Sequence, residues 1–154
     1  MRTRLIVRSA TLLTVGAMLA IGACGGHNNY PSPVEPEAAV RRFMDGVQAN
    51  NLDAMADVWG SERGPTKSFR PRDEVNKRLT VMQRYLVNDR WEFVTGNLPT
   101  RDDQGRPMLH VRLYRNGCTP VVPFTMARYG RGWLVWEVGL AAAGTPGVCQ
   151  GANQ

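Results

Sequence analysis

The sequence predicts an α+β fold in which three helices precede an antiparallel sheet of about four strands. Between residues 37 and 86, apolar side chains recur every three or four positions, the spacing that gives an α-helix one apolar face. From residue 91 onward, apolar and polar side chains alternate, as in half-buried β-strands. Because the helical segments come before the strands rather than between them, the pattern favours α+β over α/β.

The three predicted helices cover residues 37–50, 52–59 and 71–86. Pro36 and Pro71 suit the first turn of a helix, where the missing N–H of proline removes no hydrogen bond. Asn50 and Asn51 predict the turn between the first two helices. The segment 61–70 is predicted to be irregular, because it is polar and contains Gly64-Pro65.

The four predicted strands cover residues 91–95, 108–115, 121–129 and 133–140. Pro123 predicts an edge position or a bulge near the start of the third strand, because proline cannot donate to the ladder. The fourth strand is apolar on both faces apart from Glu137, which predicts a central position in the sheet.

The first 23 residues have the composition of a secretory signal peptide. Arg2, Arg4 and Arg8 precede an uncharged, mostly apolar run from Ser9 to Ala23. A helix of that run would rise roughly 22 Å, which is short of the ~30 Å hydrocarbon core of a bilayer. We therefore expect a leader that directs export rather than a permanent membrane span.

The sequence Ile21-Gly22-Ala23-Cys24 resembles the lipobox of bacterial lipoproteins. The resemblance implies that the thiol of Cys24 receives a diacylglycerol, that the leader is cut before Cys24, and that palmitate-type acyl chains hold the protein on the bilayer. It also implies a place in the cell envelope, on the exported side of the membrane (the periplasmic face in a Gram-negative bacterium). The alternative is an ordinary signal peptide with a chance cysteine.

Residues 24–36 are predicted to be a tether, because they contain three prolines and few apolar side chains. The predicted domain covers residues 37–150. After residue 23 the chain holds 16 basic and 13 acidic side chains, a net charge of +3. This charge is too small and too scattered to indicate a nucleic-acid partner.

Three cysteines are present, and if Cys24 is lipidated, Cys118 and Cys149 remain. An even pair in an oxidising compartment predicts a disulfide. A metal site would need more ligands than these two cysteines and the distant His110, and the Cys-x-x-Cys spacing of redox-active pairs is absent.

Two stretches resemble NTF2-like domains: Glu37 to Met44 followed by Asn50 to Met55, and the closing Gly130-Arg131-Gly132-Trp133-Leu134-Val135. The resemblance implies a strongly curved sheet that wraps around the helices and forms a cone with a pocket. The chain departs from the family between Trp59 and Pro71, where many members have a short strand and this chain offers only Thr66 to Phe69.

The candidate pocket residues are the polar groups on the predicted strands: His110, Arg112, Tyr114 and Glu137. The first three share one face of the second strand. Enzymes that resemble ketosteroid isomerase or scytalone dehydratase place an Asp or His base with Tyr or acid partners inside the cone. A structural role is the alternative, with Glu137 paired to Arg112 or Arg128 across the sheet.

No metalloprotease, serine-hydrolase or phosphate-loop motif occurs in the sequence. We therefore expect no catalytic residue, metal or cofactor, and a membrane-anchored module that binds an envelope protein or a small apolar ligand. Two alternatives stay open: an isomerase or hydrolase that uses the cone, and a domain that binds cell-wall polymer through arginines and tryptophans such as Trp91, Trp133 and Trp136.

Overall fold

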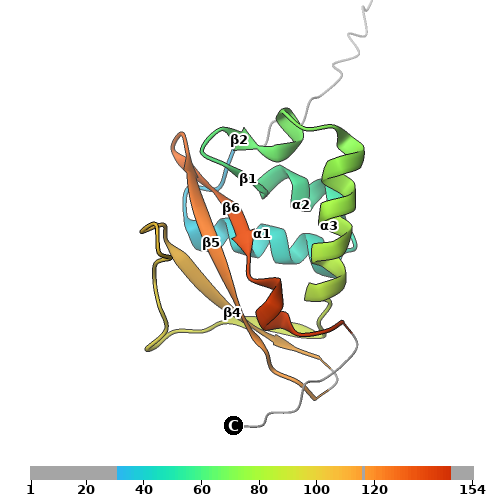
Figure 1. Cartoon of the computed structure of the whole chain (residues 1–154), viewed down its shortest axis with the longest axis vertical. Helices are drawn as coiled ribbons and strands as arrows, with labels where there is room; N and C mark the ends of the chain where they lie inside the picture. The colour runs from blue at the N-terminus through green and yellow to red at the C-terminus, as the bar shows by residue number, and fades with distance from the viewer. Residues whose placement is uncertain (1–30, 116, 147–154) are drawn as a thin grey trace, which may run out of the picture.

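Three α-helices are followed by a four-stranded antiparallel sheet in the computed structural model, which describes residues 31–115 and 117–146 (Figure 1). The helices are α1 (Pro36–Gln48), α2 (Leu52–Val58) and α3 (Arg72–Leu86). The sheet has the order β3-β4-β5-β6, with β3 (Arg90–Phe93), β4 (Met108–Tyr114), β5 (Val121–Tyr129) and β6 (Gly132–Val138). The predicted α+β class is confirmed.

The helices begin where the sequence predicts. Pro36 lies in the first turn of α1. The buried face of this helix is formed by Ala39, Val40, Phe43, Met44 and Val47. The side chain of Asn51 caps α2 by accepting a hydrogen bond from the N–H of Ala54 at 3.0 Å, which satisfies one of the free donors of the first turn. In α3, Val75, Leu79 and Leu86 are buried.

The segment between α2 and α3 is more regular than predicted. It contains the hairpin of β1 (Gly60–Ser61) and β2 (Gly64–Pro65), followed by the 3₁₀ turn η1 (Thr66–Ser68). Gly64 has a φ of +114°, a backbone conformation that favours glycine. The prediction of an irregular segment is wrong here, because two-residue strands are too short to give an alternating pattern.

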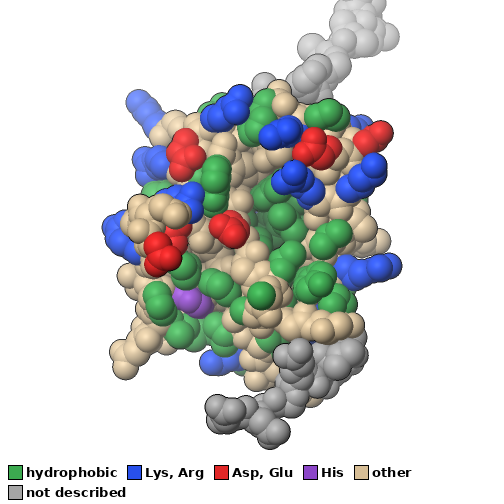
Figure 2. All heavy atoms as spheres, in the orientation of Figure 1, with side chains coloured by type: hydrophobic (Ala, Val, Ile, Leu, Met, Phe, Trp, Pro, Cys, Tyr) green, Lys and Arg blue, Asp and Glu red, His purple; other side chains and the backbone are tan. Residues whose placement is uncertain are grey.

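The core lies between the helices and one face of the sheet. The ring of Phe43 in α1 meets the ring of Phe124 in β5 edge to face, with centroids 6.1 Å apart. Val111, Leu113 and Val122 are fully buried on the same face of the sheet. In the view of Figure 2, hydrophobic side chains gather between β6 and α3, and charged side chains surround them.

The fourth strand, β6, ends the four-stranded sheet, so the prediction of a central strand is wrong. Its outer edge is nevertheless occupied. The N–H of Trp133 donates to the carbonyl of Pro33 at 2.7 Å, and Val135 forms a parallel bridge with Trp59. The guanidinium of Arg128 lies over the ring of Trp133, and the guanidinium of Arg106 lies over the ring of Trp136. These contacts explain an apolar strand at the end of a sheet.

The third strand, β5, lies between β4 and β6, so the edge alternative for Pro123 is wrong. The irregularity in its pairing with β6 falls between Thr125 and Met126. After β6 the chain turns into η2 (Leu140–Ala143), which contacts β5 and α3. No helix in the described part of the chain is long and apolar enough to cross a membrane.

Candidate functional site

An apolar pocket of about 420 Å³ lies where β3 ends, beside the connection that joins β3 to β4. Its apolar lining comes from Phe93, Val94, Leu98, Met108 and Leu109. The polar side chains that line it are those of Glu37, Thr95, Thr100 and His110, and the backbone of Gly96 completes the lining. A pocket of this size, with few polar groups, is typical of a site for a small apolar ligand.

Two backbone hydrogen bonds hold the connection at the pocket. The N–H of Val94 donates to the carbonyl of His110 at 2.9 Å, and the N–H of Met108 donates to the carbonyl of Thr100 at 2.8 Å. Between these points Gly96 has a φ of +136°, which only glycine adopts readily. The chain therefore leaves the sheet after β3 and rejoins it at β4, and the pocket lies beside this detour.

The far end of the connection is braced by Asp102. Its carboxylate accepts hydrogen bonds from Nε of Arg106 at 2.7 Å and from the backbone N–H groups of Gln104 and Arg106. Burial raises the pKa of Asp102, but the hydrogen bonds and the charge of Arg106 outweigh burial, and the net pKa is lowered. Charge-assisted hydrogen bonds to Asp102 thus hold this end of the loop.

Phe93 lines the pocket and contacts two further side chains. The ring of Trp91 meets it edge to face at 5.4 Å, and the guanidinium of Arg41 lies 5.0 Å from its ring centre. Glu37, in the first turn of α1, adds a carboxylate to the lining. The pocket is therefore lined by both the start of α1 and the end of β3.

Of the predicted pocket residues, His110 lines this pocket. It lies in β4 opposite Pro123 and is half-buried. Burial lowers the pKa of His110 below its ordinary value of 6.5, so the imidazole is mainly neutral at pH 7. A neutral imidazole is compatible with an apolar ligand.

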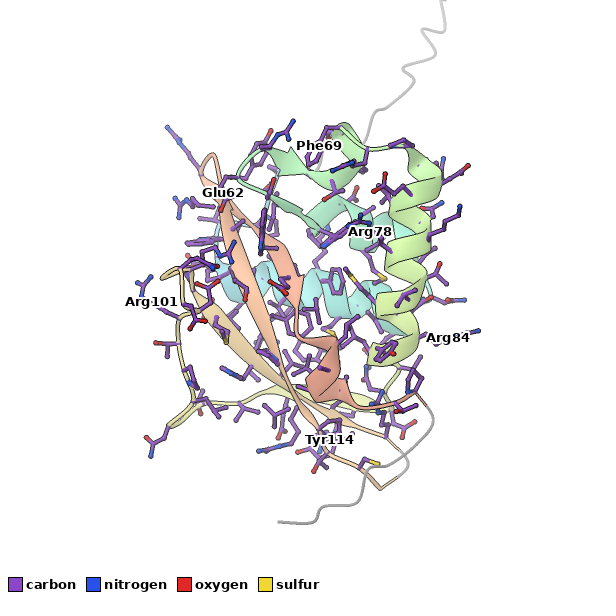
Figure 3. The ribbon with its side chains drawn as sticks, viewed as in Figure 1. Glu62, Phe69, Arg78, Arg84, Arg101 and Tyr114 are labelled. Carbon is purple, nitrogen blue, oxygen red and sulfur yellow. The ribbon has the colours of Figure 1, made fainter. Side chains whose placement is uncertain are left out.

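Arg112 and Tyr114 do not line this pocket but form a cluster with Glu92 and Arg90. Oε1 of Glu92 accepts from Nη1 of Arg112 at 3.2 Å and from the hydroxyl of Tyr114 at 2.6 Å. Nη1 of Arg90 donates to Oε2 of Glu92 at 3.3 Å, and its guanidinium lies over the ring of Tyr114. Figure 3 shows Tyr114 at the lower end of the sheet.

The contacts within the cluster lower the pKa of Glu92. The hydrogen bond from Tyr114 is the main cause that lowers the pKa of Glu92; burial opposes it, and Arg112 and Arg90 add to the lowering. Glu92 was not among the candidate residues predicted from the sequence. Its only signal in the sequence was that it alternates with Trp91 and Phe93. Once β3 pairs with β4, this alternation places Glu92 beside Arg112 on the same face of the sheet.

Glu137 is exposed in β6, opposite Thr125. The expected pairing of Glu137 with Arg112 is wrong, because Arg112 pairs with Glu92. Arg128 donates from Nε to the carbonyl of Gly130 and covers Trp133. Among the described residues no ion pair joins Arg128 to Glu137.

Cys118 lies in the turn between β4 and β5, where its N–H donates to the carbonyl of Arg115 at 2.7 Å. Cys24 and Cys149 lie outside the described residues, as does most of the predicted tether. Their lipidation and disulfide pairing stay predictions. Within the described ranges, no group of three or more His, Cys, Asp or Glu side chains forms a potential metal site.

No protein-family model matches the chain, and no curated protein matches its sequence. One solved structure, a phospholipid-binding protein from Ralstonia solanacearum in complex with a phospholipid, aligns with 66% of this chain and 73% of its own. The two are 10% identical, with a TM-score of 0.35.

Proposed function

We propose that this chain is a lipid-anchored envelope protein whose NTF2-like domain binds a small apolar ligand or an envelope protein without catalysing a reaction. The observation that carries the binding role is the apolar pocket beside the β3–β4 connection. The anchor and the NTF2-like assignment depend on the sequence resemblances at Cys24 and at the two ends of the domain.

The chemistry of the pocket supports binding rather than catalysis. Tyr114, a possible acid, and Arg112, a possible charged partner, are both held by Glu92 outside this pocket. His110, which lines it, makes no side-chain hydrogen bond to a carboxylate among the described residues. A base without an orienting partner lacks the arrangement that general acid–base sites use.

Titration with the apolar fluorescent probe N-phenyl-1-naphthylamine tests the pocket. We expect fluorescence to rise with protein concentration, and Leu98→Gln to weaken binding about fivefold or more, because it places an amide in an apolar lining. Leu98 is 36% exposed, so this change should leave the fold intact. Equal binding by wild type and Leu98→Gln contradicts the pocket as the site.

Val87→Gln is the matched control, since Val87 is an exposed apolar residue that lies outside this pocket. It should bind the probe as the wild type does. A loss equal to that of Leu98→Gln would indicate non-specific binding to surface apolar groups.

Mass spectrometry of the mature N-terminus tests the anchor separately. We expect the first residue to be Cys24 with a diacylglyceryl group on sulfur. An unmodified thiol at Cys24, or an intact leader, contradicts the anchor and leaves the pocket proposal unaffected.

A further inference from the structure

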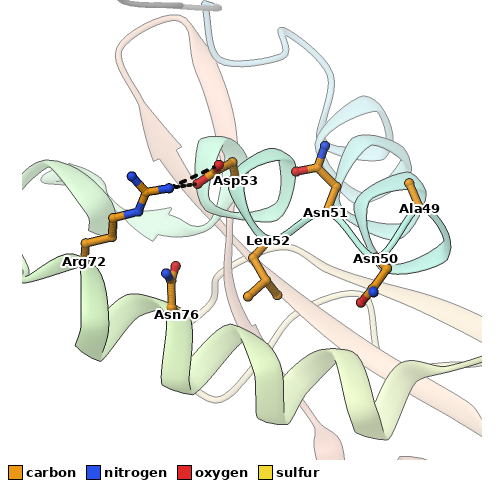
Figure 4. Close-up of a pocket in the computed structure, with 7 residues that line it drawn as sticks. All are labelled: Ala49, Asn50, Asn51, Leu52, Asp53, Arg72 and Asn76. Carbon is orange, nitrogen blue, oxygen red and sulfur yellow. Dashed lines mark hydrogen bonds and ion pairs between the residues drawn. The ribbon is translucent and has the colours of Figure 1, made fainter.

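A second concave region runs along α3, opposite the turn between α1 and α2. It consists of two hollows of about 420 and 440 Å³ that share Asn50 in their linings. Figure 4 shows the first hollow, with Arg72 and Asn76 on α3 and Asn50 across from them. We call these two hollows together the amide groove.

Carboxamides are the commonest side chains in the lining of the amide groove. Six asparagine and glutamine side chains contribute to it, from α1, the α1–α2 turn, α3 and the segment after α3: Gln48, Asn50, Asn51, Asn76, Gln83 and Asn88. Each carboxamide offers two N–H donors and one carbonyl acceptor. The groove therefore presents donors and acceptors together, without depending on charge.

Internal hydrogen bonds hold several of these amides by one end. Nε2 of Gln83 donates to Oδ1 of Asn50 at 2.6 Å, and Nε2 of Gln48 donates to Oδ1 of Asn88 at 3.2 Å. Among the described residues, no hydrogen bond uses the side-chain NH₂ group of Asn50 or the side-chain oxygen Oε1 of Gln83, whereas both ends of the Asn88 amide are used, since its Nδ2 donates to the carbonyl of Leu86. A ligand would thus meet amides that are already oriented, which lowers the entropy lost on binding.

The charges at the groove largely cancel one another. Arg72 and Asp53 form an ion pair at 3.2 Å, and both side chains are 76% exposed. Arg84 belongs to the second hollow, but Figure 3 shows its side chain directed away from the fold. The groove therefore does not select strongly for an anion or a cation.

The groove also has an apolar element. Leu52 is half-buried and points towards α3 between Asn50 and Asn76 (Figure 4). Neutral sugars combine hydroxyl groups, which are both donors and acceptors, with apolar C–H faces. From these features we propose that the amide groove binds a neutral, polyhydroxylated glycan chain.

A peptide fits the groove less well. Peptides commonly bind by adding a strand to an open sheet edge, or by placing apolar side chains of a helix into an apolar groove. Here both walls are helices or turns, and the lining mixes carboxamides with a few separate apolar side chains. The proposal uses none of the residues of the apolar pocket, so it stands whether or not the proposed function is correct.

Nitrogen-15 NMR tests the proposal, because the side-chain NH₂ groups of Asn and Gln give signals of their own. The full chain without its leader is titrated with two neutral hexasaccharides, chitohexaose and maltohexaose, and with an uncharged Gly-Ser peptide. We expect at least one hexasaccharide to shift the NH₂ signals of Asn50, Asn76 and Gln83. No shift with either sugar, or shifts with the peptide alone, overturns the proposal.

Asn76→Leu and Gln83→Met remove one carboxamide each at nearly constant size. Each should weaken sugar binding about fivefold or more, as expected for the loss of a hydrogen bond. Gln104→Met is the matched control, because Gln104 lies in the β3–β4 connection outside the groove, and it should bind as the wild type does. Binding by Asn76→Leu and Gln83→Met equal to that of the wild type overturns the proposal.

Discussion

The hydroxyl of Tyr114 and the carboxylate of Glu92 are the closest polar pair in the cluster on the outer face of the sheet, at 2.6 Å. A carboxylate that accepts hydrogen bonds is stabilised in its charged form, so its pKa falls. In the folded protein Glu92 thus stays charged at a lower pH than in the unfolded chain. The stability it contributes is complete above its ordinary pKa of 4.5 and is lost as pH falls through the lowered value.

We expect Tyr114→Phe to raise the pKa of Glu92, because it removes the largest cause of the lowering. Carbon-13 NMR titration of the Glu92 carboxyl measures this directly. Arg90→Gln should raise the same pKa by a smaller amount, since Arg90 acts on Glu92 mainly through charge. A Glu92 pKa that does not change in Tyr114→Phe would contradict the hydrogen bond.

The titration of His110 should make the free energy of unfolding depend on pH in a range above that of Glu92. Because burial lowers its pKa, the unfolded chain binds a proton below about pH 6.5 more readily than the folded protein does. The contribution of His110 to stability is therefore complete above that pH and is lost as the pH falls through the lowered pKa. We expect the free energy of unfolding of His110→Gln, measured in urea from about pH 7 to about pH 5, to decline less than that of the wild type.

At the scale of elements, the hairpin of β1 and β2 depends on one glycine. Gly64 combines a φ of +114° with close packing, since a Cβ there would lie 3.2 Å from the ring of Tyr129. Gly64→Ala should therefore lower the free energy of unfolding by about 1–3 kcal/mol. Thermal and urea unfolding measure the effect.

Gly130→Asn is the control for this prediction. Gly130 also has a positive φ, +56°, but nothing lies within 4 Å of the position of a Cβ. Asparagine tolerates this conformation, so the stability should change little. If both variants lose equal stability, the contact with Tyr129 does not matter.

The elements themselves were largely predictable from the sequence, because their core faces have long periodic patterns. The α1 stripe through Phe43 and Met44 and the alternation of Leu109, Val111 and Leu113 required no knowledge of distant contacts. The order of β6 in the sheet was not predictable, since its outer edge is occupied by Pro33 and Trp59, which lie far away in the sequence.

The candidate site was less predictable than the fold. The sequence placed His110, Arg112 and Tyr114 on one face of a strand, which the structure confirms. Whether Arg112 meets Glu92 or Glu137 depends on which strand pairs beside it and in which register. That register follows the length and shape of the connection between Phe93 and Met108, which local patterns do not specify.

At the scale of the whole molecule, the predicted disulfide between Cys118 and Cys149 would close a loop of roughly 30 residues. Such a loop stabilises the fold by about 3–4 kcal/mol, mainly by restricting the unfolded chain. We expect Cys118→Ser to lose about this much in urea unfolding, and Cys149→Ser to match it. Labelling both thiols with iodoacetamide in the non-reduced, denatured protein would contradict the bridge.

The bond from Trp133 to the carbonyl of Pro33 bears on how the domain would face a bilayer. Gly132 lies so close to Ser32 that an added Cβ would be 2.5 Å from it, so the chain enters the domain at the hairpin of β5 and β6. From Cys24 to that point is nine residue steps, at most about 32 Å. With the lipid at Cys24, the segment 24–33 would keep the hairpin of β5 and β6 within that distance of the membrane surface.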